Sequence, residues 1–219
     1  MKCGKRLIAG VFAAVLSLGL TACSSVKFEP TETSIFIQKD RKVVSAEIES
    51  FDNSAYADSP RYKEDELKAF VEDAVITYNS ENGGAAKAYV EEKGEELPVA
   101  VESLTVADNT ATLLLDFASA DDYLLFNGTA DAAPVKDLII GTVQDGVNSG
   151  LDFSGMVNAD GTAADLDKLT SSSKYSLVSV TGSTVMKVEG KVVYMSAGVT
   201  LKDEHTVVTT DDTSYIIFK

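Results

Sequence analysis

The residue with the most distinctive chemistry is Cys23, because a cysteine thiolate is a strong nucleophile. The chain has two cysteines, and the other one, Cys3, stands close to its beginning. Cys23 follows Leu20, Thr21 and Ala22. Cys23 is therefore a candidate for covalent modification.

The segment in front of Cys23 has the order of a secretory signal. It begins with the cationic residues Lys2, Lys5 and Arg6 and continues with an apolar run over residues 7–18, which is the pattern of exported chains. The run is short for a transmembrane helix, which needs about 20 apolar residues. Residues 20–23 resemble the lipobox of bacterial lipoproteins, and this resemblance covers residues 1–25.

The resemblance to bacterial lipoproteins implies that Cys23 takes a diacylglyceryl group and that residues 1–22 are removed as a signal peptide. Cys23 then becomes the mature N-terminus, and two acyl chains hold a protein stably on a membrane. The expected location is the outer face of the cytoplasmic membrane, or the outer membrane if the host is Gram-negative. Two alternatives remain open: an ordinary signal cut at Ala22 with an incidental Cys23, or an uncut anchor.

The charge of the chain restricts its partners. Three of the 19 basic residues and none of the 34 acidic ones lie in residues 1–22, so removal of that segment changes the formal net charge from −15 to −18. Such a surface repels phosphate backbones, so we expect no nucleic-acid partner. Lipidation would use the sulfur of Cys23 and leave no intrachain disulfide, so the fold must rely on its apolar core. We expect no cofactor.

One loop has a pattern of oxygen ligands. Residues 158–162 read Asn-Ala-Asp-Gly-Thr, with oxygen-bearing side chains at alternate positions before a turn glycine, as in the middle of a calcium loop. Met156 occupies the place of that loop's first Asp, and Asp167 the place of its final Glu. Asn158, Asp160 and Asp167 are therefore a candidate calcium site. The alternative is a simple Asp-Gly turn.

The sequence predicts no catalytic residue. Ser171 and Lys174 match the Ser-x-x-Lys nucleophile motif of penicillin-binding proteins, but the Ser-Asp-Asn and Lys-Thr-Gly partners of that motif are absent. The sole histidine, His205, falls in a charged turn between predicted strands. A zinc site needs about three or four ligands, and the chain offers neither a second histidine nor a free cysteine for one.

The first secondary-structure elements that the sequence predicts are two strands and a helix. Residues 34–37 and 42–49 predict a hairpin with one solvent-exposed face. The clearest helix starts with three acidic residues at 64–66, which suit the positive end of its dipole, and stops at Gly83-Gly84. Its predicted apolar stripe comprises Leu67, Phe70, Val71, Ala74, Val75 and Tyr78.

The remaining pattern alternates turns and short elements. Residues 99–106 and 110–117 predict paired strands around Asp108-Asn109, and Ser119 predicts the start of a short helix through Phe126. Pro134 predicts the start of another helix, whose apolar face is Val135, Leu138, Ile139, Val143 and Val147. After an irregular connection over residues 151–173, residues 184–189 and 191–196 predict a hairpin at Gly190. Residues 199–202, 206–209 and 214–218 predict further strands.

These elements predict an α+β fold, a mostly antiparallel sheet with two or three helices packed on one side. We expect residues 1–22 to be the signal peptide, 23–33 the lipidated cysteine with a polar tether, and 34–219 a single domain. Two domains joined near residues 154–173 are the open alternative.

The expected function is that of a membrane-anchored, non-catalytic module that binds a protein or glycan partner or organises the cell envelope. Residues 102–106 and 110–117 are faintly similar to small β-rich modules of Gram-positive sporulation and envelope lipoproteins. The alternative is an envelope hydrolase that acts on glycan or peptidoglycan through carboxylates brought together by the fold.

Overall fold

The structure, a computed structural model, describes residues 26–51, 63–83, 85–128 and 133–219 of the chain. Its first half contains β1 (Ser34–Ile37), β2 (Val43–Ser50), α1 (Glu64–Asn82), β3 (Val99–Ala107), β4 (Thr110–Phe117) and α2 (Ala120–Asn127). The second half contains β5 (Asp137–Thr142), α3 (Val143–Asn148), β6 (Met156–Asn158), α4 (Leu166–Thr170), β7 (Ser176–Thr181), β8 (Val185–Val188), β9 (Val192–Ser196), β10 (Thr200–Leu201), β11 (Thr206–Val208) and β12 (Thr213–Phe218).

The strands form two sheets. A seven-stranded sheet has the order β10-β11-β8-β1-β2-β4-β3, and a five-stranded sheet has the order β5-β7-β12-β9-β6. Only the β1–β8 pair is parallel among the pairs of named strands in the described residues. The predicted α+β class with mostly antiparallel strands is therefore confirmed, although the strands divide between two sheets and not one.

The two predicted hairpins of the seven-stranded sheet are confirmed. β1 pairs with β2, and β3 pairs with β4 through Asp108 and Asn109, which both have positive φ angles, 49° and 59°, as a tight hairpin turn requires. The predicted solvent-exposed face of the first hairpin is wrong for the first half of β2, where residues 43–46 are all buried. This half is covered on both faces of the sheet.

Helix α1 ends at Gly83 as predicted, but its buried stripe differs from the predicted one. Phe70 is 73% exposed, whereas Val71, Val75 and the polar Asn79 are buried. Asn79 accepts a hydrogen bond from the Val99 N–H at 3.0 Å and donates to the Val99 and Lys87 carbonyl oxygens at 2.7 Å each. The helix is thus fastened to β3 by an amide, a role that a search for apolar spacing misses.

Helix α2 begins and ends close to the predicted residues and packs between α1 and β4. Its aromatic side chains meet those of both neighbours: Phe126 contacts Tyr78 edge-on at 5.5 Å, and Tyr123 contacts Phe117 edge-on at 5.3 Å between ring centroids. Edge-to-face pairs add to the stabilisation that burial alone provides. The Tyr78 hydroxyl also donates to Asp122 of α2 at 3.1 Å.

The helix predicted from Pro134 is wrong over its first half, which is strand β5. Leu138 is 2% exposed and Ile139 52% exposed, an alternation that fits a strand and not a helix. Helix formation is delayed until Thr142, where the Thr142 hydroxyl accepts from the Asp145 N–H and the Asp145 carboxylate accepts from the Thr142 N–H. This reciprocal cap starts α3.

The predicted hairpin at Gly190 is also wrong, because β8 and β9 belong to different sheets. The chain crosses between the sheets at Gly190, where a Cβ atom would collide with the carbonyl oxygen of Lys219. Lys191 exchanges two backbone hydrogen bonds with Lys219, at 2.9 and 3.1 Å, so the C-terminal residue fixes this crossing. Strand β7, which pairs with β12 and β5, was not predicted.

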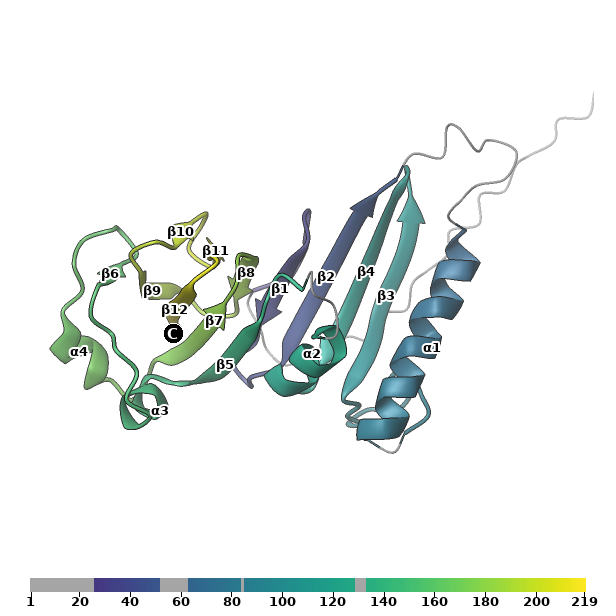
Figure 1. Cartoon of the computed structure of the whole chain (residues 1–219), viewed down its shortest axis with the longest axis horizontal. Coiled ribbons are helices and arrows are strands. Elements are labelled where there is room, and N and C mark those ends of the chain that lie inside the picture. Colours follow the sequence, from purple (N-terminus) through teal and green to yellow (C-terminus); the bar gives the residue numbers. More distant parts are fainter. Residues whose placement is uncertain (1–25, 52–62, 84, 129–132) are drawn as a thin grey trace, which may run out of the picture.

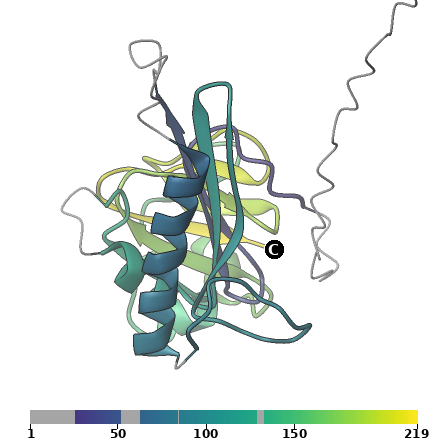
Figure 2. The same cartoon turned by 90° about the vertical axis from the view of Figure 1, so that its right-hand side faces the viewer.

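The two sheets share one apolar core. It contains Ile35 and Met186 from the large sheet, and Val178 and Ile216 from the small one. Figure 1 shows α1 at one end of the long axis and the small sheet with α3 and α4 at the other end. Figure 2 shows α1 lying along the large sheet. Among the described residues, no helix has the length and hydropathy needed to cross a membrane.

Candidate binding cleft between the sheets

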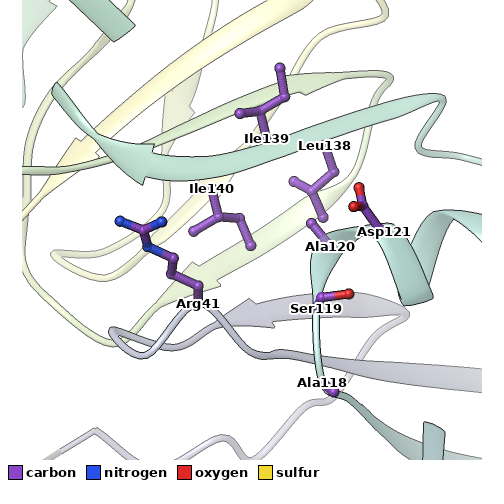
Figure 3. Close-up of a pocket in the computed structure, with 8 residues that line it drawn as sticks. All are labelled: Arg41, Ala118, Ser119, Ala120, Asp121, Leu138, Ile139 and Ile140. Atoms are coloured by element: carbon purple, nitrogen blue, oxygen red, sulfur yellow. The ribbon is translucent and has the colours of Figure 1, made fainter. Parts of the chain in front are cut away.

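A cleft of about 400 Å³ lies where the small sheet meets the start of α2 and the turn between β1 and β2. Three separate segments line it: Arg41 from the turn, residues 118–121 at the start of α2, and residues 138–140 of β5 (Figure 3). β5 is an edge strand of its sheet. The cleft therefore runs beside a strand that, in the described residues, pairs with another strand on one side only.

The floor of the cleft is apolar. Leu138 and Ile140 point from β5 toward Ala120, whereas the side chain of Ile139, between them, points to the other face of the strand (Figure 3). Leu138 is buried and Ile140 half-buried. The floor can therefore accept an apolar side chain from a partner.

Arg41 forms the positively charged rim. It has a φ angle of 73° and donates its N–H to the Gln38 carbonyl oxygen at 3.1 Å, so a tight turn fixes its backbone. Its guanidinium lies 3.6 Å from the Asp145 carboxylate, and both side chains are more than half exposed. The pKa of Asp145 is lowered, first by the hydrogen bonds from Thr142 and then by the charge of Arg41. Asp145 thus remains an anion beside the cleft.

The start of α2 forms the opposite rim. Ser119 caps this helix: its hydroxyl accepts from the Asp122 N–H at 3.0 Å and donates to the Asp122 carboxylate at 2.6 Å. This hydroxyl is occupied as a helix cap and is not arranged as a nucleophile. Asp121 is the only carboxylate among the lining residues. The apolar floor thus lies between Arg41 on one rim and Asp121 on the other.

A second group of charges lies at the same end of β4, outside the cleft lining. Burial first, and then the nearby charge of Glu102, raise the pKa of Asp116 to about 6, while Lys42 opposes this shift. The pKa of Glu102 is also raised by loss of water around its carboxyl group. Lys42 itself forms an ion pair with Glu96 at 2.8 Å. The pKa of the Asp116 carboxyl group is therefore well above that of an exposed aspartate.

The side chains of Asn158 and Asp160 in the predicted calcium loop form hydrogen bonds within their own turn. The Asn158 amide donates to the Thr162 hydroxyl at 2.9 Å and to the Ala163 carbonyl oxygen at 3.0 Å. Asp160 accepts from the Thr162 N–H at 3.0 Å. Asp167 lies in α4. In the described parts of the chain, no group of three or more His, Cys, Asp or Glu is arranged to hold a metal ion. The calcium site stays a prediction.

The other chemically suggestive residues have local roles. Ser171 follows α4, and its hydroxyl donates to the Lys168 carbonyl oxygen at 3.4 Å. His205 is half-buried, and its Nδ1 lies 2.7 Å from the Gly190 carbonyl oxygen, where it supports the crossing between the sheets. Ala22 and Cys23, the predicted cleavage and lipidation residues, lie outside the described residues.

Sequence reasoning missed the cleft because its three segments are far apart in the chain. One local signal pointed to it, the Ser119 cap that places Asp121 in the first turn of α2. Leu138 and Ile140 were assigned to a helix face or left out, so their common direction was missed. Comparison of the chain with family models, curated proteins and solved structures found no match.

Proposed function

We propose that the protein is an exported module, anchored to the membrane through diacylglyceryl-Cys23, that binds a protein partner in the cleft between its sheets without catalysis. The proposed location is the outer face of the cytoplasmic membrane, or the outer membrane of a Gram-negative host. The observation that carries the proposal is the apolar floor of Leu138, Ile140 and Ala120 beside the free edge of β5.

A peptide fits this cleft better than a glycan does. No aromatic side chain is among the lining residues, so the cleft lacks the rings on which a sugar would stack. A free strand edge offers backbone hydrogen bonds to an extended peptide, and alternate side chains of that peptide can enter a pocket. The partner we propose is an extended segment with an apolar side chain for the floor and an acidic group near Arg41.

Site-directed photo-cross-linking on whole cells tests this function. A photoreactive residue replaces Ile140, which points into the cleft, or Ile139, its neighbour on the opposite face of the same strand. We expect a discrete protein adduct from position 140 that exceeds any adduct from position 139 several-fold. Because Ile139 is the more exposed residue, non-specific reaction would give the reverse pattern.

A charge reversal adds a second measurement. Arg41→Glu changes the rim, while its exposed ion pair with Asp145 contributes little to folding. We expect the adduct from position 140 to fall several-fold in this variant. Equal adducts from positions 139 and 140, or an adduct that Arg41→Glu leaves unchanged, would refute binding in the cleft.

An envelope hydrolase is the second candidate, and the observation that favours it is the pKa of Asp116. A carboxyl group with a pKa near 6 can hold a proton close to neutral pH, as a general acid does, and Glu102 is a second carboxyl group nearby. Release of soluble fragments from purified peptidoglycan tests this candidate. Activity that is lost in Asp116→Asn but kept in Asp73→Asn, on the exposed side of α1, would favour the hydrolase over the binding module.

A further inference from the structure

The first described residues after Cys23 are packed against the domain. The Phe28 ring stacks on Phe36 of β1, with 5.3 Å between the ring centroids and 14° between the ring planes. Lys187 of β8 donates from its Nζ to the carbonyl oxygen of Lys27 at 2.6 Å. Part of the segment predicted as a polar tether, residues 26–33, therefore lies on the large sheet.

The second half of the segment is held as well. The Ile48 N–H donates to the Thr33 hydroxyl oxygen at 3.0 Å, and Glu32 forms an ion pair with Lys202. The contacts reach β2 on one side of β1 and the end of β10 on the other. They are spread over several strands, so the direction in which the segment leaves the domain is fixed.

The segment lies on the face of the large sheet that points away from α1. Phe36 pairs directly with Val44 and Lys187, and directly paired residues point to the same face. Their neighbours Ile35 and Ile37 point to the opposite face, into the shared core. In Figure 2, α1 and the purple start of the described chain lie on opposite sides of the sheet.

Burial on this face supports the packing of the segment. Phe36 and Val44 are each 4% exposed, although α1, α2 and the small sheet contribute to the core on the other face. Phe28 supplies the cover for Phe36. Farther along the same face, Thr200 is exposed. Thr200 pairs with Val208, and the adjacent pair, Leu201 and Val207, faces the core. Thr200 therefore points away from the core, as Phe36 does.

Little chain separates this face from the proposed lipid. Only Ser24 and Ser25 stand between Cys23 and Val26, and three trans peptide units span at most about 11 Å between their Cα atoms. Acyl chains on Cys23 would therefore hold the start of the packed segment close to the head groups. A free tether would leave the orientation of the domain open, but a packed segment does not.

We propose that the face of the large sheet beside residues 26–33 rests on the lipid bilayer and that α1, α2 and the cleft point away from it. This inference rests on the proposed anchor at Cys23. Lys187 and Lys202 stand at this face together with the carboxyl groups of Glu32 and Asp116, and lysines near a bilayer are attracted to anionic head groups, whereas the chain as a whole is strongly acidic. The orientation presents the cleft to partners outside the membrane.

Two matched single-cysteine variants test the orientation. Acylation leaves no free thiol in the mature chain, so a new cysteine is the only site for a thiol-reactive fluorophore. Thr200→Cys lies on the proposed membrane face, and Thr77→Cys on the exposed side of α1. The acylated full-length protein is placed in vesicles of phosphatidylethanolamine and phosphatidylglycerol that carry a head-group quencher. We expect quenching at position 200 to exceed that at position 77 several-fold.

The outcomes separate the two proposals. Purified protein without an acyl group on Cys23, as measured by its mass, contradicts the proposed anchor. Acylated, vesicle-bound protein with equal quenching at both positions, or with more at position 77, overturns the orientation alone.

Removal of the Phe28 ring gives a further check. Phe28→Ala should leave acylation and vesicle binding intact but reduce the difference in quenching between positions 200 and 77, because the segment is released from Phe36. Phe28→Tyr keeps a ring for stacking and should retain the difference. A full difference in Phe28→Ala would show that the packed segment does not orient the domain.

Discussion

Asn79 is the polar residue that holds α1 in position against β3. Its side chain makes three hydrogen bonds with backbone groups of β3 and of the loop before it, in a site that excludes water. The loss of a hydrogen-bond partner costs much more free energy at a buried backbone group than at an exposed one. The sequence showed only an asparagine in a helix, because its partners lie elsewhere in the chain.

Asn79→Ala should lower the free energy of unfolding by about 2–4 kcal/mol, since it leaves the two buried backbone groups of Val99 and the part-buried Lys87 carbonyl oxygen without this partner. Asn82→Ala is the control. Asn82 is exposed at the end of the same helix and bonds only to the Tyr78 carbonyl oxygen within it, so its loss should have little effect. Urea denaturation measures both variants, and equal stability losses would contradict the role of Asn79.

Asp116 makes stability depend on pH. Because its pKa rises from 3.8 to about 6 in the folded chain, the folded state binds more protons between these values, and stability is lost as pH rises through that window. Asp116→Asn should therefore be more stable than the wild type at neutral pH, on the order of 2 kcal/mol, with the difference disappearing on acidification. Thermal unfolding across this range measures the effect.

Asp73→Asn removes one negative charge from an exposed place on α1 and controls for net charge. A gain in stability at neutral pH that is the same in Asp73→Asn and Asp116→Asn would assign the effect to net charge. The half-buried Asp116 would then not be its source.

At the scale of elements, β5 is where the structure departs most from the pattern in the sequence. A strand places Leu138 in the core and Ile139 in solvent, whereas the predicted helix placed both on one apolar face. Leu138→Asn should therefore cost about 3 kcal/mol or more, and Ile139→Asn less than about 1 kcal/mol. Urea denaturation distinguishes the two arrangements, and similar costs for the two variants would favour the helix.

Elements built from neighbours in the chain were predictable. Helix α1 follows from apolar spacing and its glycine stop, and the β3–β4 turn follows from Asp108-Asn109, which accept positive φ angles more readily than most residues. The role of Gly190 was predicted wrongly because a glycine between two apolar runs suits a hairpin as well as it suits a crossing between two sheets. Its contact with Lys219, which sends β8 and β9 into different sheets, connects residues that no local pattern relates.

The candidate sites also differ in whether their residues are neighbours in the chain. The predicted lipobox is a contiguous motif and stays a prediction, while Arg41, Asp121 and Ile140 line one cleft only because the sheets meet there. The calcium loop was a local pattern whose residues also make an ordinary turn. A cleft built from three segments needs the tertiary structure before any of its residues can be selected.

At the scale of the whole molecule, the two sheets share one apolar core. The large sheet contacts residues 26–33 through Phe36 of β1 and α1 through Val99 of β3. The cleft lies where the small sheet meets α2. The proposed function assigns the face beside residues 26–33 to the membrane and the cleft to a partner, so both proposals depend on a lipid at Cys23.

The mass of the N-terminal peptide of the protein, purified from the membranes of its native host, tests this most directly. We predict a peptide that begins at Cys23 and carries a diacylglyceryl group on its sulfur. A peptide that begins upstream of residue 23, or a Cys23 with an unmodified thiol, would contradict the account.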